Sequence, residues 1–147
     1  MGGIKLSDIF KSFGFLTGKV EQLLEEDFID QLKPYGINAR QFGVLIRIKE
    51  RPNTSQKEIA EDLKIDRTSM VDHVDRLESL HYIIRDKNSN DRRSYCLNLT
   101  EKGRKTVDDC LELMNQSERE VLSALEDEEK DAFKKYLIKI VKRIGEK

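Results

Sequence analysis

Residues that interrupt helices, and residues that build redox or metal sites, are scarce in this sequence. Its 147 residues include two prolines, eight glycines, two cysteines and two histidines, and no tryptophan. So few helix breakers permit long helices. Cys96 and Cys110 lack Cys-x-x-Cys spacing, and we expect both to be packing residues, the alternative being a redox-sensing Cys96. His73 and His81 form no ligand cluster with them, so we expect no metal and no cofactor.

Long apolar runs are absent as well. No run approaches the ~20 residues that a membrane-spanning helix needs, and no basic start leads into an apolar segment and a cleavage site. The opening Met-Gly is similar to a myristoylation signal, but Leu6 stands where that signal has serine or threonine. We therefore expect a cytoplasmic protein with no membrane partner.

An excess of charge of one sign is absent overall but present locally. The chain carries 27 basic and 28 acidic side chains, a formal net charge of −1, which does not by itself indicate a nucleic-acid partner. Residues 81–105, however, hold seven basic side chains against three acidic ones. A local basic excess of this size is typical of a modest DNA-binding surface.

The spacing of apolar residues predicts a mainly α fold. Steps of three and four indicate helices over about residues 6–32, 39–50, 56–63, 67–80, 101–125 and 126–144. Good N-caps stand before four of them: Ser7, Asn38, Asp66 and Thr100. Ser55 and Glu58 have the spacing of a capping box, in which each side chain binds the other residue's backbone N–H.

A small β-hairpin is expected between the fourth and fifth helices. Residues 82–84 and 95–99 are rich in β-formers. The wholly polar residues 85–93 between them predict a long basic tip. Two short helices joined by a tight turn and followed by such a hairpin make a winged helix-turn-helix lobe.

The helix over residues 67–80 would supply the DNA-reading face. Met70, Val74 and Leu77 recur at helical spacing and define its inner side. The outer side then holds Thr68, Ser69, Asp72, Asp75, Arg76 and Ser79. Arg67 sits at the end that enters the major groove in this motif, where it would reach a phosphate or a guanine edge. The alternative is an ordinary solvated face.

Three basic side chains, Lys87, Arg92 and Arg93, gather on the expected wing tip. Like charges there repel one another unless an anionic partner is present. An arginine at such a tip fits a narrow, electronegative minor groove, so the wing favours a DNA partner.

Several stretches of the chain resemble the MarR family of winged helix-turn-helix transcription regulators. The matching stretches are SQKEIA at residues 55–60, DRTS at residues 66–69 and DRLE at residues 75–78. The most specific is DRRS at residues 91–94, followed by LNLTEKG at residues 97–103. The resemblance extends over nearly the whole chain.

The resemblance implies how the chain would bind DNA. It implies a homodimer held by the first and the last two helices, with the fourth helix in the major groove and a wing arginine in the minor groove. Arg93 matches that wing arginine, and Asp91 matches the carboxylate that positions it. The DNA-binding residues that we expect are Ser55, Gln56, Arg67, Thr68, Ser69, Asp72, His73, Arg76, Lys87, Asp91, Arg92 and Arg93.

Three features depart from the family pattern. Asp72 stands where the family often has an arginine, so it would repel phosphate or accept a hydrogen bond from cytosine. His81 stands where relatives usually end the helix with glycine, and a left-handed residue there costs about 1 kcal/mol. The first helix has no cysteine, unlike that of the peroxide-sensing branch.

The helices outside the lobe carry long apolar stripes. Stripes at residues 9–28, 107–125 and 133–144 exceed what one small lobe can cover, which also predicts a homodimer. We therefore divide the chain into an N-terminal dimerisation helix (residues 1–36), the DNA-binding lobe (residues 37–100) and C-terminal dimerisation helices (residues 101–147). The family's effectors are small, often aromatic or phenolic compounds that bind between these parts. Phe15, Tyr35 and Phe42 lie near that junction, the alternative being core packing.

The sequence thus predicts a sequence-specific transcription regulator, a repressor, that binds a pseudo-palindromic double-stranded operator. Catalysis is one alternative, with His73 as a general base. His73 lies on the flank of the recognition helix, however, which favours packing or phosphate contact, so we expect no enzyme. The other is a helix-turn-helix module for protein–protein assembly without DNA binding. Asp72 and the near-neutral charge favour it, whereas Arg92 and Arg93 oppose it.

Overall fold

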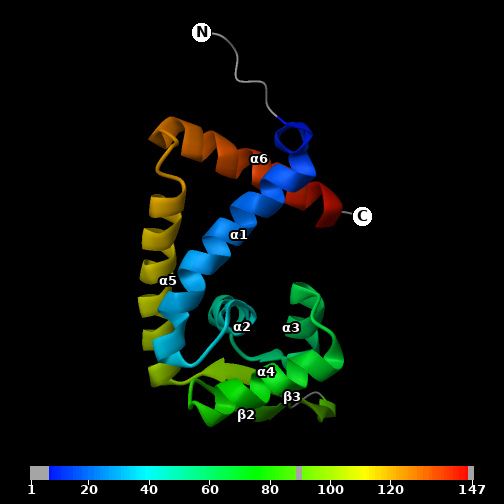
Figure 1. Ribbon diagram of the computed structural model, residues 1–147. Coiled ribbons are helices and arrows are strands. Elements are labelled where there is room, and N and C mark those ends of the chain that lie inside the picture. The colour runs from blue at the N-terminus through cyan, green and yellow to red at the C-terminus, as the bar shows by residue number, and fades with distance from the viewer. Residues whose placement is uncertain (1–6, 89–90, 146–147) are drawn as a thin grey trace.

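The computed structural model describes residues 7–88 and 91–145, with the backbone alone at residues 88, 91–94, 144 and 145. It is mainly helical with one small sheet, as predicted (Figure 1). Its elements in chain order are η1 Asp8–Lys11, α1 Phe13–Leu32, η2 Lys33–Tyr35, α2 Ala39–Glu50, β1 Thr54–Ser55, α3 Gln56–Leu63, α4 Arg67–Ser79, β2 Ile83–Asn88, β3 Asp91–Leu99, α5 Glu101–Val121 and α6 Asp127–Gly145.

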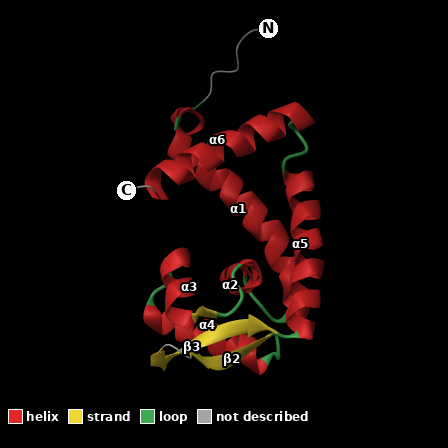
Figure 2. Ribbon diagram, turned by 180° about the vertical axis from the view of Figure 1, so that it is seen from behind, coloured by secondary structure: helices red, strands yellow, loops and turns green. Residues whose placement is uncertain are grey.

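The elements form a small lobe with long helices rising from it. The lobe contains α2, α3, α4 and the sheet. Helix α1 packs along α5, and both helices extend away from the lobe (Figure 1). Figure 2 shows the sheet at the end of the molecule opposite α6. Among the described residues, no helix is long and apolar enough to cross a bilayer.

The core of the lobe forms where α2 meets α4. Met70, Val74 and Leu77 are fully or almost fully buried, which confirms the predicted inner side of α4. They pack with buried side chains of α2, β3 and α5: Phe42, Leu45, Ile48, Leu97 and Val107. The other side of α4 therefore faces away from the core.

Three of the predicted N-caps are confirmed. Asn38 accepts a hydrogen bond from the Gln41 amide at 2.8 Å, Asp66 from the Ser69 amide at 2.8 Å, and Thr100 from the Gly103 amide at 2.9 Å. The complete capping box lies at α2, because the Gln41 side chain also accepts from the Asn38 amide.

The capping box predicted at α3 is only half formed. Ser55 accepts from the Glu58 amide at 3.1 Å, but the return bond from Ser55 to the Glu58 carboxylate is not made. Ser55 also belongs to strand β1, where it stands opposite Cys96 of β3.

The first helix begins later than predicted, at Phe13 rather than near Leu6. Ser12 has an extended backbone and accepts from the Phe15 amide at 3.4 Å, so it caps α1 in place of Ser7. A single 3-10 turn, η1, precedes it. Helix α5 also ends early, at Val121, because the chain turns at residues 122–125 before α6.

The sheet has three antiparallel strands in the order β1-β3-β2, one more than predicted. Strand β1 is only two residues long and pairs with Leu97 and Cys96, too short to leave an alternating pattern in the sequence. Strands β2 and β3 also extend through most of the polar segment that was predicted as a long tip. Ladder hydrogen bonds use the backbone, so charged side chains do not prevent pairing.

Candidate nucleic-acid interface

The N-terminus of α4 is held in place by its cap. Lys64 adopts a left-handed conformation with φ 53°, which ends α3 and makes the turn short. Asp66 then accepts hydrogen bonds from both the backbone amide and the hydroxyl of Ser69, each at 2.8 Å. Backbone bonding from Ser69, followed by its hydroxyl, lowers the pKa of Asp66. The Ser69 hydroxyl, expected to contact DNA, is therefore already committed to this cap as a donor.

Three predicted DNA-binding residues stand free on the outer side of this helix. Arg67, Thr68 and Asp72 are exposed. Arg67 and Asp72 form no ion pair with any described residue. A cation, a hydroxyl and a carboxylate thus lie on one surface, available to an external partner.

Two other predicted residues attach the flank of α4 to the start of α2 and to the segment just before it. The Arg76 guanidinium donates to the Gly36 carbonyl from Nε at 3.2 Å and from Nη2 at 3.1 Å. His73 Nδ1 lies 3.3 Å from Gln41 Nε2. These bonds give both side chains a structural role in orienting α4, while their predicted contacts with DNA remain a prediction.

The start of α3 holds the other two expected contact residues. Ser55 is buried and caps the helix, so its hydroxyl is bound within the lobe. Gln56 is half-buried, and its Oε1 atom has no hydrogen-bond partner among the described residues.

The wing residues are only partly covered by the structure. Lys87 is exposed on β2. Asp91, Arg92 and Arg93 lie in β3, but their side chains fall outside the described part of the chain. Their predicted roles stay predictions.

Arg85 also belongs to this region, although its sequence position predicted only a place in the polar tip of the wing. Its guanidinium donates to Glu78 from Nε at 3.2 Å and also binds Asp75. Burial by itself lowers the pKa of Arg85, but the hydrogen bonds to Glu78 and Asp75 outweigh it and raise the pKa. The signal that could have revealed it is the spacing of Asp75 and Glu78, three residues apart on one side of a helix that precedes the hairpin.

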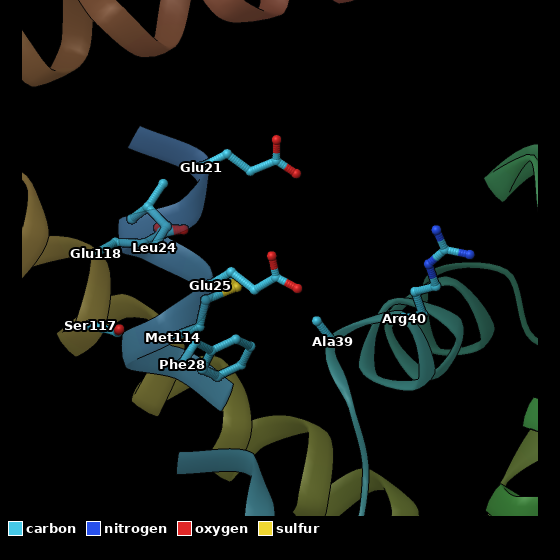
Figure 3. Close-up of a pocket in the computed structure, with 9 residues that line it drawn as sticks. All are labelled: Glu21, Leu24, Glu25, Phe28, Ala39, Arg40, Met114, Ser117 and Glu118. Atoms are coloured by element: carbon cyan, nitrogen blue, oxygen red, sulfur yellow. The ribbon is translucent and has the colours of Figure 1, made fainter. Parts of the chain in front are cut away.

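A hollow of about 530 Å³ lies between α1, α5 and the start of α2. It is lined by Glu21, Leu24, Glu25, Phe28, Ala39, Arg40, Met114, Ser117 and Glu118 (Figure 3). Glu21 and Glu25 point from α1 into the gap that faces α2. The hollow therefore combines an apolar wall with acidic side chains at the junction of the helices and the lobe.

None of the three residues expected at an effector site lines this hollow. Phe42 is buried in the core with its ring 5.4 Å from that of Phe28, so Phe28 is the aromatic side chain that reaches the hollow. Phe15 is exposed on α1, and Tyr35 is half-buried where its carbonyl accepts from the Tyr82 hydroxyl.

Neither cysteine is placed for chemistry. Both are buried, and burial, helped by the nearby Asp109 carboxylate, raises the pKa of Cys110 to about 11. In the part of the chain that the structure covers, no group of three His, Cys, Asp or Glu side chains could hold a metal ion.

Comparison with known proteins identifies the class of this lobe. The model of the MarR family matches residues 37–95, which span α2, the helix-turn-helix and most of the hairpin. The chain is 30% identical over 127 residues to the HTH-type transcriptional regulator BilQ of Clostridium symbiosum, covering 84% of this chain and 85% of BilQ. It is 31% identical over 129 residues to the transcriptional repressor MprA of Escherichia coli, covering 86% of this chain and 73% of MprA.

A solved structure extends the likeness beyond the lobe. The transcriptional repressor CouR, bound to a 23-mer DNA duplex, superposes with a TM-score of 0.84 at 28% identity, covering 95% of this chain and 99% of CouR. The likeness therefore includes the long helices as well as the lobe.

Proposed function

Since the chain belongs to the MarR family and is a transcription regulator, we propose that it acts as a homodimeric repressor that reads a pseudo-palindromic operator in double-stranded DNA. The observation that carries this proposal is the outer face of α4, where Arg67, Thr68 and Asp72 are exposed while the inner face is buried. CouR, which shares this fold, is itself described on a DNA duplex.

The proposed contacts divide into two kinds. Arg67 and Thr68, at the N-terminal end of α4, would contact bases and phosphates in the major groove. Lys87 and Arg92 would neutralise phosphates, and Arg93 would enter the minor groove. Phosphate contacts give general affinity, whereas base contacts select the operator.

Two copies of the chain would be joined through the long helices, residues 1–36 and 101–147. Apolar side chains are exposed there in numbers unusual for a monomer: Ile9, Phe10, Phe13, Phe15, Tyr136, Leu137, Ile138, Ile140 and Val141. The exposed fraction reaches 87% at Phe13 and 68% at Val141. A twofold dimer would cover these faces and present two α4 helices about one helical turn of DNA apart, ~34–36 Å.

A small aromatic effector is proposed for the hollow beside α2. Leu24, Phe28 and Met114 offer apolar contact to a ring. The lining also holds three carboxylates, of Glu21, Glu25 and Glu118, against the single guanidinium of Arg40. This excess of negative charge would repel an anionic phenolate and favours a neutral or cationic aromatic compound. Because Ala39 and Arg40 line the hollow at the start of α2, a ligand there would touch the lobe directly.

Selection of bound fragments from random duplex DNA tests the proposal. The expected result is a pseudo-palindromic sequence whose affinity falls steeply as salt rises from about 50 to 200 mM. Failure to bind any duplex at low salt would overturn it and would favour the assembly module without DNA, which the exposed Asp72 carboxylate already suits. A repressor of this kind would work in the cytoplasm and would need no catalytic group.

A further inference from the structure

The Arg85 side chain connects the wing to the recognition helix. From β2 its guanidinium donates to Glu78 Oε2 through Nε at 3.2 Å and to Glu78 Oε1 through Nη2 at 3.3 Å, and it also binds Asp75 through Nη2. Only 22% of the side chain is exposed. A planar guanidinium held by two carboxylates of one helix has little freedom to rotate.

Strand β2 depends on α4 for support. It lies at the edge of the sheet, in the order β1-β3-β2, so within the described residues it pairs with β3 alone. Ile83 is buried whereas Ile84 is exposed, which places Arg85 on the same face as Ile83, toward α4. A two-stranded hairpin is only marginally stable by itself, so side-chain contacts with α4, such as those of Arg85, stabilise β2.

We infer that Arg85 is a positioning residue for DNA recognition: it fixes the wing relative to α4 through Asp75 and Glu78 and does not itself contact DNA. The inference rests on the proposed use of α4 and the wing. Two carboxylates around one guanidinium leave this cluster with a net charge of about −1, which repels phosphate. Lys87, two residues farther along β2, is exposed and would carry the contact instead.

Removing the two carboxylates gives a test in which the inference and simple electrostatics predict opposite changes in affinity for the operator. The double variant Asp75→Asn with Glu78→Gln removes two negative charges from a surface near DNA, so charge alone would tighten binding to every duplex. If the carboxylates hold Arg85, the variant binds the selected operator about tenfold more weakly while binding to random duplex is unchanged or stronger. Tighter binding to the operator would overturn the inference.

Arg85→Gln provides the second arm. We expect about a tenfold loss of affinity for the operator, a loss of less than about threefold for random duplex, and no change in the slope of log affinity against log salt. If Arg85 contacted a phosphate, its loss would instead weaken binding to all duplexes alike and would reduce that slope by about one unit. Arg85→Lys should restore only part of the affinity, because a lysine cannot form the two-pronged bond.

Arg51→Gln is the matched control. It removes the same charge and an ion pair of the same lobe, with Asp62 on α3, and among the described residues Arg51 forms no ion pair with α4 or β2. We expect operator affinity close to wild type. Combining Arg85→Gln with the carboxylate double variant should cost little more than either alone, since all three side chains act as one unit. Additive losses would overturn the inference.

The result separates the two proposals. If the wild-type protein binds no duplex, the proposed function fails. If wild type binds its operator and Arg85→Gln binds it equally well, this inference alone fails. Thermal unfolding and sedimentation of each variant establish that the dimer is folded. If Arg85→Gln does not fold, the carboxylate double variant still tests the inference.

Discussion

Gly103 lies directly against the backbone of Tyr82. A Cβ atom at Gly103 would stand 2.0 Å from the Tyr82 carbonyl oxygen and 2.9 Å from its carbonyl carbon. The same oxygen accepts a hydrogen bond from the Thr100 amide at 3.0 Å. The first turn of α5 thus packs directly against the segment between α4 and β2. This close approach explains why the LTEKG stretch has glycine, which has no Cβ atom, at position 103.

Gly103→Ala should destabilise the protein by about 2 kcal/mol or more, because the neighbouring atom is backbone and cannot rotate away. The measurement is urea unfolding followed by circular dichroism. Gly43→Ala is the control, since nothing lies within 4 Å of a Cβ there and alanine favours the helix. We expect Gly43→Ala to raise stability by about 0.5–1 kcal/mol, and equal effects of the two substitutions would contradict the steric argument.

His81 ends α4 in the left-handed conformation that glycine prefers, with φ 63°. Its amide donates to the Glu78 carbonyl at 2.9 Å, and the next amide, of Tyr82, donates to the Leu77 carbonyl at 3.0 Å. His81→Gly should therefore keep these bonds and raise the free energy of unfolding by up to about 1 kcal/mol. A decrease in stability would show that the imidazole makes a compensating contribution.

Both thiols should be unreactive in the folded protein. The pKa of Cys110 is raised to about 11 by burial, so at pH 8 only about one molecule in a thousand would carry a thiolate there. Cys96 is protected by its place in the core of the sheet. A colorimetric thiol reagent should label fewer than one group per chain until denaturant is added, and rapid labelling of the native protein would revive the redox-sensing alternative for Cys96.

Much of the lobe could be predicted from the sequence because its signals are local. Met70, Val74 and Leu77 recur at helical spacing, and Asn38, Asp66 and Thr100 cap the helices that follow them. Such patterns depend on neighbours within one or two turns.

The parts that were missed depend on partners distant in the chain. Strand β1 exists only because Thr54 and Ser55 pair with β3, more than 40 residues away. The polar segment of the wing forms strands because each side supplies the other with backbone partners. The role of Arg85 follows from the packing of β2 on α4, which no single stretch of sequence encodes.

Asp72 is the residue whose substitution should change the choice of operator most clearly. It is exposed on the outer face of α4, and no described cation neutralises it. A carboxylate there can accept a hydrogen bond from cytosine N4, whereas an amide pairs with adenine. We expect Asp72→Asn to shift the preferred base at the contacted position from cytosine toward adenine.

Asp72→Arg should change both selectivity and general affinity. The new cation would tighten binding to random duplex and steepen the dependence of log affinity on log salt by about one unit, while the wild-type operator loses its advantage. Asp131→Arg makes the same change of charge on α6, far from the lobe (Figure 1), and should leave the choice of operator unaltered. Fragment selection with wild type and the three variants measures the preference directly. If both substitutions at Asp72 leave the selected sequence unchanged, this carboxylate reads no base, and operator choice must rest on Arg67, Thr68 and the wing.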